Sequence, residues 1–164
     1  IRRVAKTTKG GKNFHFTALV VIGNNKDKVG AGLGKSNEVP DAIRKGIDKA
    51  KKNLIEISLN GRTISHEVYA KHLTSQVMIR PASSGTGVIA GGAVRSVLEL
   101  AGIKDVLTKS LGSRNPINVV NATIECLKQL NDPAKTAANH GKKQEDLDLP
   151  KQYYRNKAEG EVNA

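Results

Sequence analysis

The segment between Phe14 and Ile22 constrains the fold more than any other part of this sequence. Its side chains alternate along an extended chain, with one side formed by Phe14, Phe16, Ala18, Val20 and Ile22 and the other by His15, Thr17, Leu19 and Val21. Alternation with a period of two residues is typical of a β-strand, and apolar groups on both sides favour a central strand. A polar turn stands at each end, Lys9-Gly10-Gly11-Lys12 before it and residues 24–28 after it. The sequence therefore predicts a central strand between two basic turns.

This strand is expected to belong to a small antiparallel sheet covered by one helix. A first strand is predicted over residues 2–7, and another begins at Val29, because Val29, Ala31 and Leu33 share one side. Between Val39 and Leu54 apolar residues recur every three or four positions, which predicts an α-helix with lysines on its outer faces. Ser36-Asn37 offers a polar cap, and Pro40 fits the first turn. Three strands and a helix over residues 1–62 would form a first domain.

Residues 63–131 are predicted to form a second, mixed βα domain with two helices. Strands are expected over residues 64–70, 76–81 and 106–110, the second with Val77 and Ile79 inward. The helix that carries Val94, Val97, Leu98 and Ala101 can end at Gly102, and the last helix starts at Asn115-Pro116. The glycine-rich run over residues 83–92 is expected to be an irregular loop, and residues 132–164 an extended tail. The predicted fold class is α+β.

Positive charge is concentrated in the predicted first domain. The chain of 164 residues has 27 Lys and Arg against 15 Asp and Glu, a net charge of +12. Residues 1–62 hold 14 basic and 5 acidic groups, whereas residues 132–164 hold 6 of each. Such a charge points to nucleic acid or to an anionic membrane surface. The sequence lacks an apolar run of about 18 residues and an amphipathic helix with large apolar side chains, which disfavours the membrane.

The residues expected to contact RNA phosphates are basic side chains of this first domain together with two glycines. Lysine and arginine displace counterions from a polyanion, and glycine lets a backbone approach closely. An ordinary solvated surface is the alternative for any one of these loops. Aromatic residues make up 3% of the chain, so base stacking is not expected to be the main mode of contact. The predicted set is Arg2, Arg3, Lys6, Lys9, Gly10, Gly11, Lys12, Lys26, Lys28, Arg44, Lys45, Lys51 and Lys52.

Two glycine-rich segments imitate nucleotide-binding motifs. Residues 29–36 nearly match the phosphate loop GxxxxGK[ST], but Val29 replaces the first glycine and the helix is expected to start only near Pro40. Residues 85–90 match a dinucleotide fingerprint, with Asp105 about 20 residues further on. The remaining chain is too short for the parallel strands that such a site needs. A nucleotide- or dinucleotide-dependent enzyme that uses residues 85–92 is the chief alternative function.

Side chains for catalysis or metal binding are not grouped in the sequence. His15, His66, His72 and His140 are scattered without ligand spacing, and the single cysteine, Cys126, falls inside a predicted helix. No cofactor and no metal site are therefore expected. One cysteine excludes an intrachain disulfide and favours a reducing compartment. No signal-peptide pattern is present, and whether a segment precedes Ile1 is left open.

A series of short segments stands in a fixed order along the chain: KGGKNF (9–14), FTAL (16–19), VGAG (29–32), GK (34–35), EVP (38–40), RPAS (80–83), GTGVIAGG (85–92), GS (112–113) and NPINVV (115–120). Their order and spacing resemble the small ribosomal subunit protein five family in its bacterial type. The resemblance runs from about residue 3 to residue 130 and does not include the tail. Two departures are the turn Lys26-Asp27-Lys28, which is often glycine-rich in the family, and Gly46, which interrupts the first helix.

This resemblance implies a non-enzymatic constituent of the small ribosomal subunit near the decoding region. Its first domain would be similar to a double-stranded-RNA-binding module whose loop at residues 6–12 reaches 16S-type rRNA near the site of spectinomycin action. The glycine-rich run and following helix, with Gly85, Gly87, Gly91, Gly92 and Arg95, would contact ribosomal protein four and influence decoding accuracy.

Further partners and the location follow from the same resemblance. Ribosomal protein eight is implied as a neighbour of the C-terminal region, and the channel through which messenger RNA reaches the subunit is implied nearby. The expected location is the cytoplasm, with an organellar ribosome left open. A free-standing regulator that binds double-stranded RNA is a third possibility. Co-sedimentation of the protein with small subunits would distinguish a ribosomal protein from such a regulator.

Overall fold

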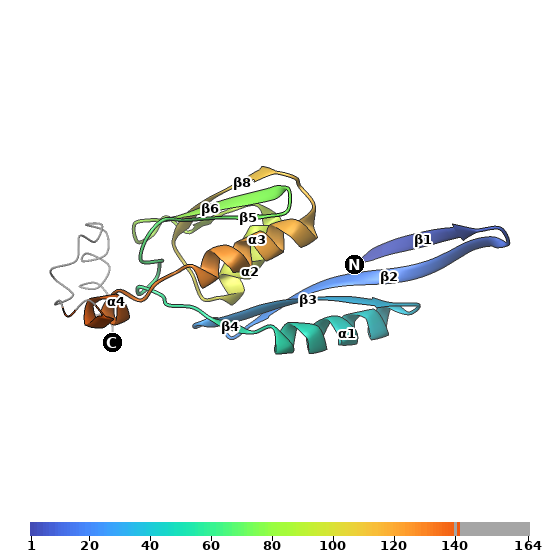
Figure 1. Ribbon diagram of the computed structural model, residues 1–164, viewed down its shortest axis with the longest axis horizontal. Helices are drawn as coiled ribbons and strands as arrows, with labels where there is room; N and C mark the ends of the chain where they lie inside the picture. Colours follow the sequence, from blue (N-terminus) through green and yellow to red (C-terminus); the bar gives the residue numbers. More distant parts are fainter. Residues whose placement is uncertain (140, 142–164) are drawn as a thin grey trace.

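The computed structural model describes residues 1–139 and 141, and it has the predicted α+β architecture. The described strands form two four-stranded sheets, with orders β1-β2-β3-β4 and β5-β6-β8-β7. Figure 1 shows α1 along the outer face of the first sheet, and α2 and α3 between the two sheets. The elements are β1 (Arg2–Thr8), β2 (Gly11–Gly23), β3 (Lys28–Ser36), α1 (Val39–Lys52), β4 (Ile55–Glu56), β5 (Val68–His72), β6 (Ser75–Pro81), β7 (Val88–Ile89), α2 (Gly92–Leu100), β8 (Val106–Gly112), α3 (Pro116–Lys128) and α4 (Pro133–Asn139).

Strand β2 is central, as its alternation predicts. It pairs antiparallel with β1 on one side and with β3 on the other. One of its faces turns towards α1, where Val20 meets Gly46. On the opposite face Leu19 and Val21 pack against the core that α2 and α3 help to form. Both faces of β2 are therefore covered by helices, which explains why the segment is apolar on both sides.

The glycines of β3 seat helix α1 against the sheet. Gly30, Gly32 and Gly34 alternate with Val29, Ala31 and Leu33, so the three glycines share the face that α1 covers. A Cβ atom on Gly34 would lie 2.5 Å from the Gly46 backbone nitrogen. The helix backbone therefore rests directly on the strand, and the phosphate-loop-like sequence is a packing surface within a strand.

Helix α1 starts at Val39, as predicted, but differs from its prediction in its N-terminal cap, its C-terminal end and its buried face. It begins after Glu38, which makes no side-chain cap, and Ser36 belongs to β3. It ends at Lys52, so Leu54 lies outside it and is exposed. The buried positions are the small residues Ala42, Gly46 and Ala50. The departure at Gly46 thus has a packing role, because only small side chains allow the close approach to β3.

The second sheet follows its predicted strands except at short or irregular segments. Val77 and Ile79 are fully buried, as expected. Strand β5 starts at Val68 rather than at residue 64, because residues 64–67 form an irregular bend after the turn that the Asn60–Thr63 bridge closes. Strands β4 and β7, of two residues each, were not predicted. Strand β7 lies within the run expected to be irregular. It pairs parallel with β8, and helix α2 connects the two strands along the chain.

Helix α3 starts and helix α2 ends where the sequence predicts. Asn115 caps α3, because its side-chain oxygen accepts a hydrogen bond from the Ile117 backbone N–H at 3.2 Å. Gly102 follows α2 with φ of +90°, the left-handed conformation expected at a helix end. The buried stripe of α2 consists of Val94, Val97, Leu98 and Ala101. Local capping and periodicity were sufficient to place these two helices.

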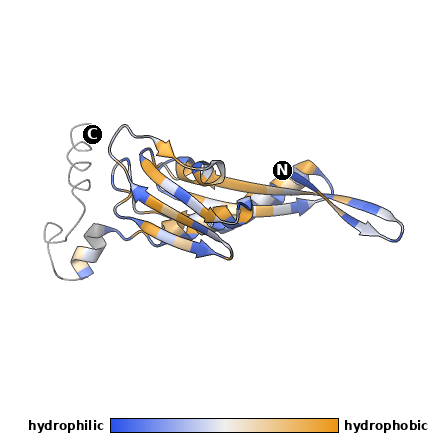
Figure 2. Ribbon diagram, turned by 90° about the horizontal axis from the view of Figure 1, so that it is seen from above, coloured by the Kyte–Doolittle hydropathy of each residue, from blue (hydrophilic) through white to orange (hydrophobic). Residues whose placement is uncertain are grey.

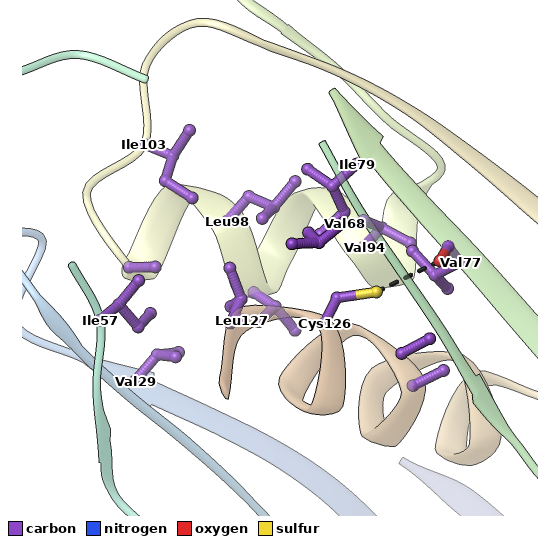
Figure 3. Packing of buried hydrophobic residues seen from close by; sticks show 14 of the residues in the cluster. Val29, Ile57, Val68, Val77, Ile79, Val94, Leu98, Ile103, Cys126 and Leu127 are labelled. Atoms are coloured by element: carbon purple, nitrogen blue, oxygen red, sulfur yellow. Dashed lines mark hydrogen bonds between the residues drawn. The ribbon is translucent and has the colours of Figure 1, made fainter. Parts of the chain in front are cut away.

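One hydrophobic core joins the two sheets. Figure 3 shows Val29 of β3 and Ile57 beside Leu98 and Leu127 of the two inner helices. Cys126 lies in the same cluster, and its thiol donates a hydrogen bond of 3.2 Å to the Val77 carbonyl. Burial raises the pKa of the Cys126 thiol to about 12. The predicted boundary between residues 62 and 63 falls in the connection between the sheets and stays a prediction.

The described part of the tail begins with a helix. Helix α4 spans Pro133–Asn139, so the prediction of an extended chain does not hold for these residues. Its Thr136 side chain donates a hydrogen bond of 2.9 Å to the Asp132 carbonyl. The prediction for residue 140 and residues 142–164, with His140 among them, lies outside the described residues.

Candidate nucleic-acid interface

The β1–β2 hairpin is the part of the molecule best placed to meet a polyanion. Strand β3 first pairs with β2 at Phe16, so the part of the β1–β2 hairpin from Val4 to His15 extends past the rest of the sheet. Every residue of β1 is exposed. Figure 2 shows that the distal end of the hairpin is mostly hydrophilic, in contrast to the body of the protein. The hairpin therefore presents backbone and side chains to a partner on several sides.

The hairpin carries all the predicted basic residues of the first strand and turn, namely Arg2, Arg3, Lys6, Lys9 and Lys12. No Asp or Glu occurs before Asp27. Gly11 has φ of +138°, a conformation that other residues rarely adopt, whereas Gly10 has space for a side chain. The turn therefore requires glycine at position 11, and the positive charge around it is not balanced by local carboxylates.

The two basic turns lie at opposite ends of β2. This strand has 13 residues, so the turn with Lys9 and the turn with Lys26 are about 40 Å apart. The second turn is held by Asn24, whose side-chain oxygen accepts backbone hydrogen bonds from Lys26 and Lys28. It also docks on α2, because the Asn25 backbone N–H donates a 3.0 Å hydrogen bond to the Leu100 carbonyl. Lys26 and Lys28 thus cannot form one continuous patch with the hairpin.

The basic residues of α1 form a separate surface. Arg44, Lys45, Lys51 and Lys52 are all exposed on this helix. Lys45 makes a 3.4 Å hydrogen bond to the Ser36 hydroxyl. Lys51 and Lys52 fall in the last helical turn, where positive side chains also stabilise a helix through its dipole. The structure therefore brings together only part of the residues predicted to contact RNA. The basic residues of the β1–β2 hairpin are the most exposed group among them.

The glycine loop before α2 is fixed by a buried carboxylate. Asp105 is 1% exposed, and its Oδ1 atom accepts a hydrogen bond of 2.8 Å from the Gly87 backbone N–H. Its Oδ2 atom accepts one of 2.7 Å from Arg62 Nε. Desolvation by burial raises the pKa of Asp105, but the hydrogen bonds and the Arg62 charge outweigh it, so the pKa is lowered. The carboxylate is therefore ionised at neutral pH and clamps the loop to the connection between the sheets.

These hydrogen bonds of Asp105 are incompatible with a dinucleotide-binding site. In such a site Asp105 would be free to bind ribose and the Gly87 N–H would face phosphate, whereas here the two groups bind each other. The second sheet is also mostly antiparallel, with β7 and β8 as the parallel pair. Among the described residues, no group of three or more His, Cys, Asp or Glu could hold a metal ion. A helix long and apolar enough to span a bilayer is likewise not found in the described part.

The remaining predicted interface residues surround the start of α2. Gly85, Gly91 and Gly92 are exposed, and Gly87 is half-buried. Arg95 lies in the first turns of α2 and donates a 3.0 Å hydrogen bond to the Val88 carbonyl. Loop and helix thus meet at one exposed corner, so this part of the predicted set is contiguous.

Sequence reasoning missed two contributions to these surfaces. The Arg62–Asp105 pair joins residues 43 positions apart, and no local pattern signals it. The alternation of β2 places Phe14 on an apolar side of the strand, yet its ring is half-exposed and Arg3 lies over it. The signal for Phe14 was its position beside the basic turn, beyond the part of β2 that β3 covers.

A two-sheet α+β chain with a projecting basic hairpin falls, on comparison with known families, in the class of ribosomal proteins. Residues 1–58 match the model described as ribosomal protein S5, N-terminal domain, and residues 70–140 match ribosomal protein S5, C-terminal domain. The chain is similar to the small ribosomal subunit protein uS5 of Alteromonas mediterranea, with 51% identity over 147 residues, 90% of this chain and 89% of that protein. The chain belongs to the ribosomal protein S5 family.

Membership of this family confirms the resemblance drawn from the motifs. It is a family of structural proteins of the small ribosomal subunit that take part in translation and is not an enzyme family. The C-terminal match continues to residue 140, beyond the end that the motifs indicated. The rRNA and other ribosomal proteins are accordingly the partners that the family implies.

Proposed function

We propose that this protein binds 16S-type rRNA near the decoding region through its β1–β2 hairpin, as a non-enzymatic constituent of cytoplasmic small subunits. The observation that carries the proposal is the hairpin itself, which is basic, free of acidic residues and extended past the sheet. Arg2, Arg3, Lys6, Lys9 and Lys12 neutralise phosphates, and the turn at Gly10 and Gly11 lets the backbone approach the RNA. Arg44, Lys45, Lys51 and Lys52 of α1, with Lys26 and Lys28, contribute secondary contacts.

The salt dependence of binding tests this proposal. If the hairpin and α1 engage about 6 to 10 phosphates, affinity for the rRNA falls by about 10³- to 10⁵-fold between about 50 and 200 mM salt, because binding releases condensed counterions. The measurement is a titration of the full chain with small-subunit rRNA of Alteromonas mediterranea at several salt concentrations. An affinity that hardly changes with salt concentration would contradict the proposal.

We also propose that the corner formed by Gly85, Gly87, Gly91, Gly92 and Arg95 contacts ribosomal protein four. The loop is exposed, its backbone is held by Asp105, and Arg95 extends from α2 beside it. A loop of fixed shape next to a cation suits a polar contact that opens and closes during decoding. Ribosomal protein eight near the C-terminal region and the messenger RNA channel complete the proposed surroundings.

Charge reversal at this corner is expected to change decoding accuracy. Ribosomes carrying Arg95→Glu should misread at an altered frequency, by about tenfold if one charge-assisted contact of about 1.5 kcal/mol is lost. Lys109→Glu, on an exposed position of β8, is the matched control and should leave accuracy unchanged. The readout is misreading of a reporter codon, together with the yield of small subunits. Normal accuracy with Arg95→Glu would contradict the proposed contact.

A further inference from the structure

An aromatic ring is exposed among the basic side chains of the hairpin. Phe14 is 48% exposed, although the alternation of β2 continues the apolar face to this position. Its part of β2 pairs only with β1, because β3 first pairs at Phe16 opposite Ser36. The residue directly across from Phe14 is Ala5, whose methyl group is too small to cover the ring. The ring therefore has an open side.

Arg3 contributes a second flat group, which lies over this ring. Its guanidinium carbon lies 4.9 Å from the centroid of Phe14, a cation–π distance. The two side chains share a face, since Arg3 lies opposite Phe16 and alternates in step with Ala5. Aromatic rings and arginine planes are the groups on which unpaired RNA bases stack. A stacking platform is thus already assembled in the free protein.

The surroundings of the platform favour RNA over a protein partner. Lys12 lies two positions before Phe14, on the same face of β2, and is exposed. No carboxylate occurs among residues 1–26 to repel a phosphate. Across the hairpin the ring faces Ala5 and Arg3, and along β2 it lies between Lys12 and the half-buried Phe16, so basic side chains stand on two of its sides.

We propose that Phe14 and Arg3 form a stacking site for one unpaired nucleobase of RNA, with Lys12 pairing with an adjacent phosphate. This inference rests on the proposed rRNA-binding function and adds a base contact to it. The phosphate contacts give affinity that depends on salt, whereas stacking depends on the ring. The two contributions are therefore separable by experiment.

The experiment uses the absence of tryptophan from the chain. Phe14→Trp places a single indole at the site, and Val4→Trp places one on the opposite face of the same hairpin, at a position that is 39% exposed. Each full-length variant is titrated with small-subunit rRNA. Stacking should quench the emission of the indole at position 14 strongly and leave that at position 4 nearly unchanged.

An affinity measurement completes the test. Phe14→Leu keeps an apolar side chain but removes the ring, and it should weaken rRNA binding by about 5- to 150-fold with an unchanged salt slope. Equal quenching at the two positions, or full affinity of Phe14→Leu, would overturn the stacking site. Quenching at position 14 only after the other small-subunit proteins are added would assign the ring to a protein partner and also overturn it. In each case a steep salt slope would leave the proposed function standing.

Discussion

Replacing Gly34 with alanine is expected to destabilise the protein by about 3 kcal/mol, the upper range for overpacking a core. A Cβ atom at this position would meet the backbone nitrogen of Gly46 at 2.5 Å and the Ala42 carbonyl carbon at 3.0 Å. These are backbone atoms of α1 and cannot rotate away, so the helix must lift off β3. Because alanine in a strand is otherwise favoured over glycine by about 0.5 to 1 kcal/mol, a loss of stability would have to come from this contact. The measurement is the urea concentration at the midpoint of unfolding.

Two other glycines provide matched controls for Gly34. Gly10→Ala should leave the midpoint almost unchanged, since an added Cβ atom there meets nothing within 4 Å. The unfolding midpoint of Gly46→Ala should lie between those of Gly34→Ala and Gly10→Ala. Its Cβ atom would meet the Val20 side chain at 2.7 Å, and a side chain can move. Equal midpoints for Gly34→Ala and Gly10→Ala would show that α1 does not rest on the strand as described.

Reversing two charges at the hairpin turn is expected to weaken rRNA binding at least about 100-fold. The variant Lys9→Glu with Lys12→Glu removes two contacts to phosphate, and each hydrogen bond to a charged group contributes about 1.5 to 3 kcal/mol. Repulsion between the new carboxylates and the RNA adds to the loss. Stability should not change, because Lys9 and Lys12 are exposed and make no ion pair among the described residues. Affinity is measured by titration at about 0.1 M salt.

The opposite end of β2 supplies a control with the same change in net charge. Lys26→Glu with Lys28→Glu alters the second basic turn, about 40 Å from the first along a strand of 13 residues. Its effect on affinity should stay below about tenfold, since this turn docks on α2 and contributes secondary contacts. Equal losses for the two double variants would mean that net charge, rather than the hairpin, governs binding.

Local patterns predicted most of the individual elements. The alternation of β2 identified a central strand, the stripe of α2 identified a buried helix, and Asn115-Pro116 marked the start of α3. These features depend on residues within one or two turns of one another, so their physical cause is present in a short segment. Strands β4 and β7 escaped prediction, because a pair of residues has no period and becomes a strand only by pairing with a distant neighbour.

The candidate site was predictable in its chemistry but not in its geometry. The concentration of lysine and arginine in the first third was sufficient to favour nucleic acid, and the motifs were sufficient to indicate the family. The sequence could not show that the two basic turns stand apart, or that Asp105 occupies the Gly87 N–H that a dinucleotide would need. Both facts depend on the length of a strand or on contacts between distant segments.

The sequence by itself determined most of the strands and helices, where the charge lies and to which family the chain belongs, since periodicity, capping and composition act locally. The tertiary structure decided what each face of those elements meets. In the folded protein helix α1 packs on the glycines of β3, and α2 and α3 cover the other face of β2. Phe14 lies beyond the end of β3 and stays exposed. The physical reason is that packing brings together residues distant in the chain, and no short pattern specifies which of the possible partners will cover an apolar face.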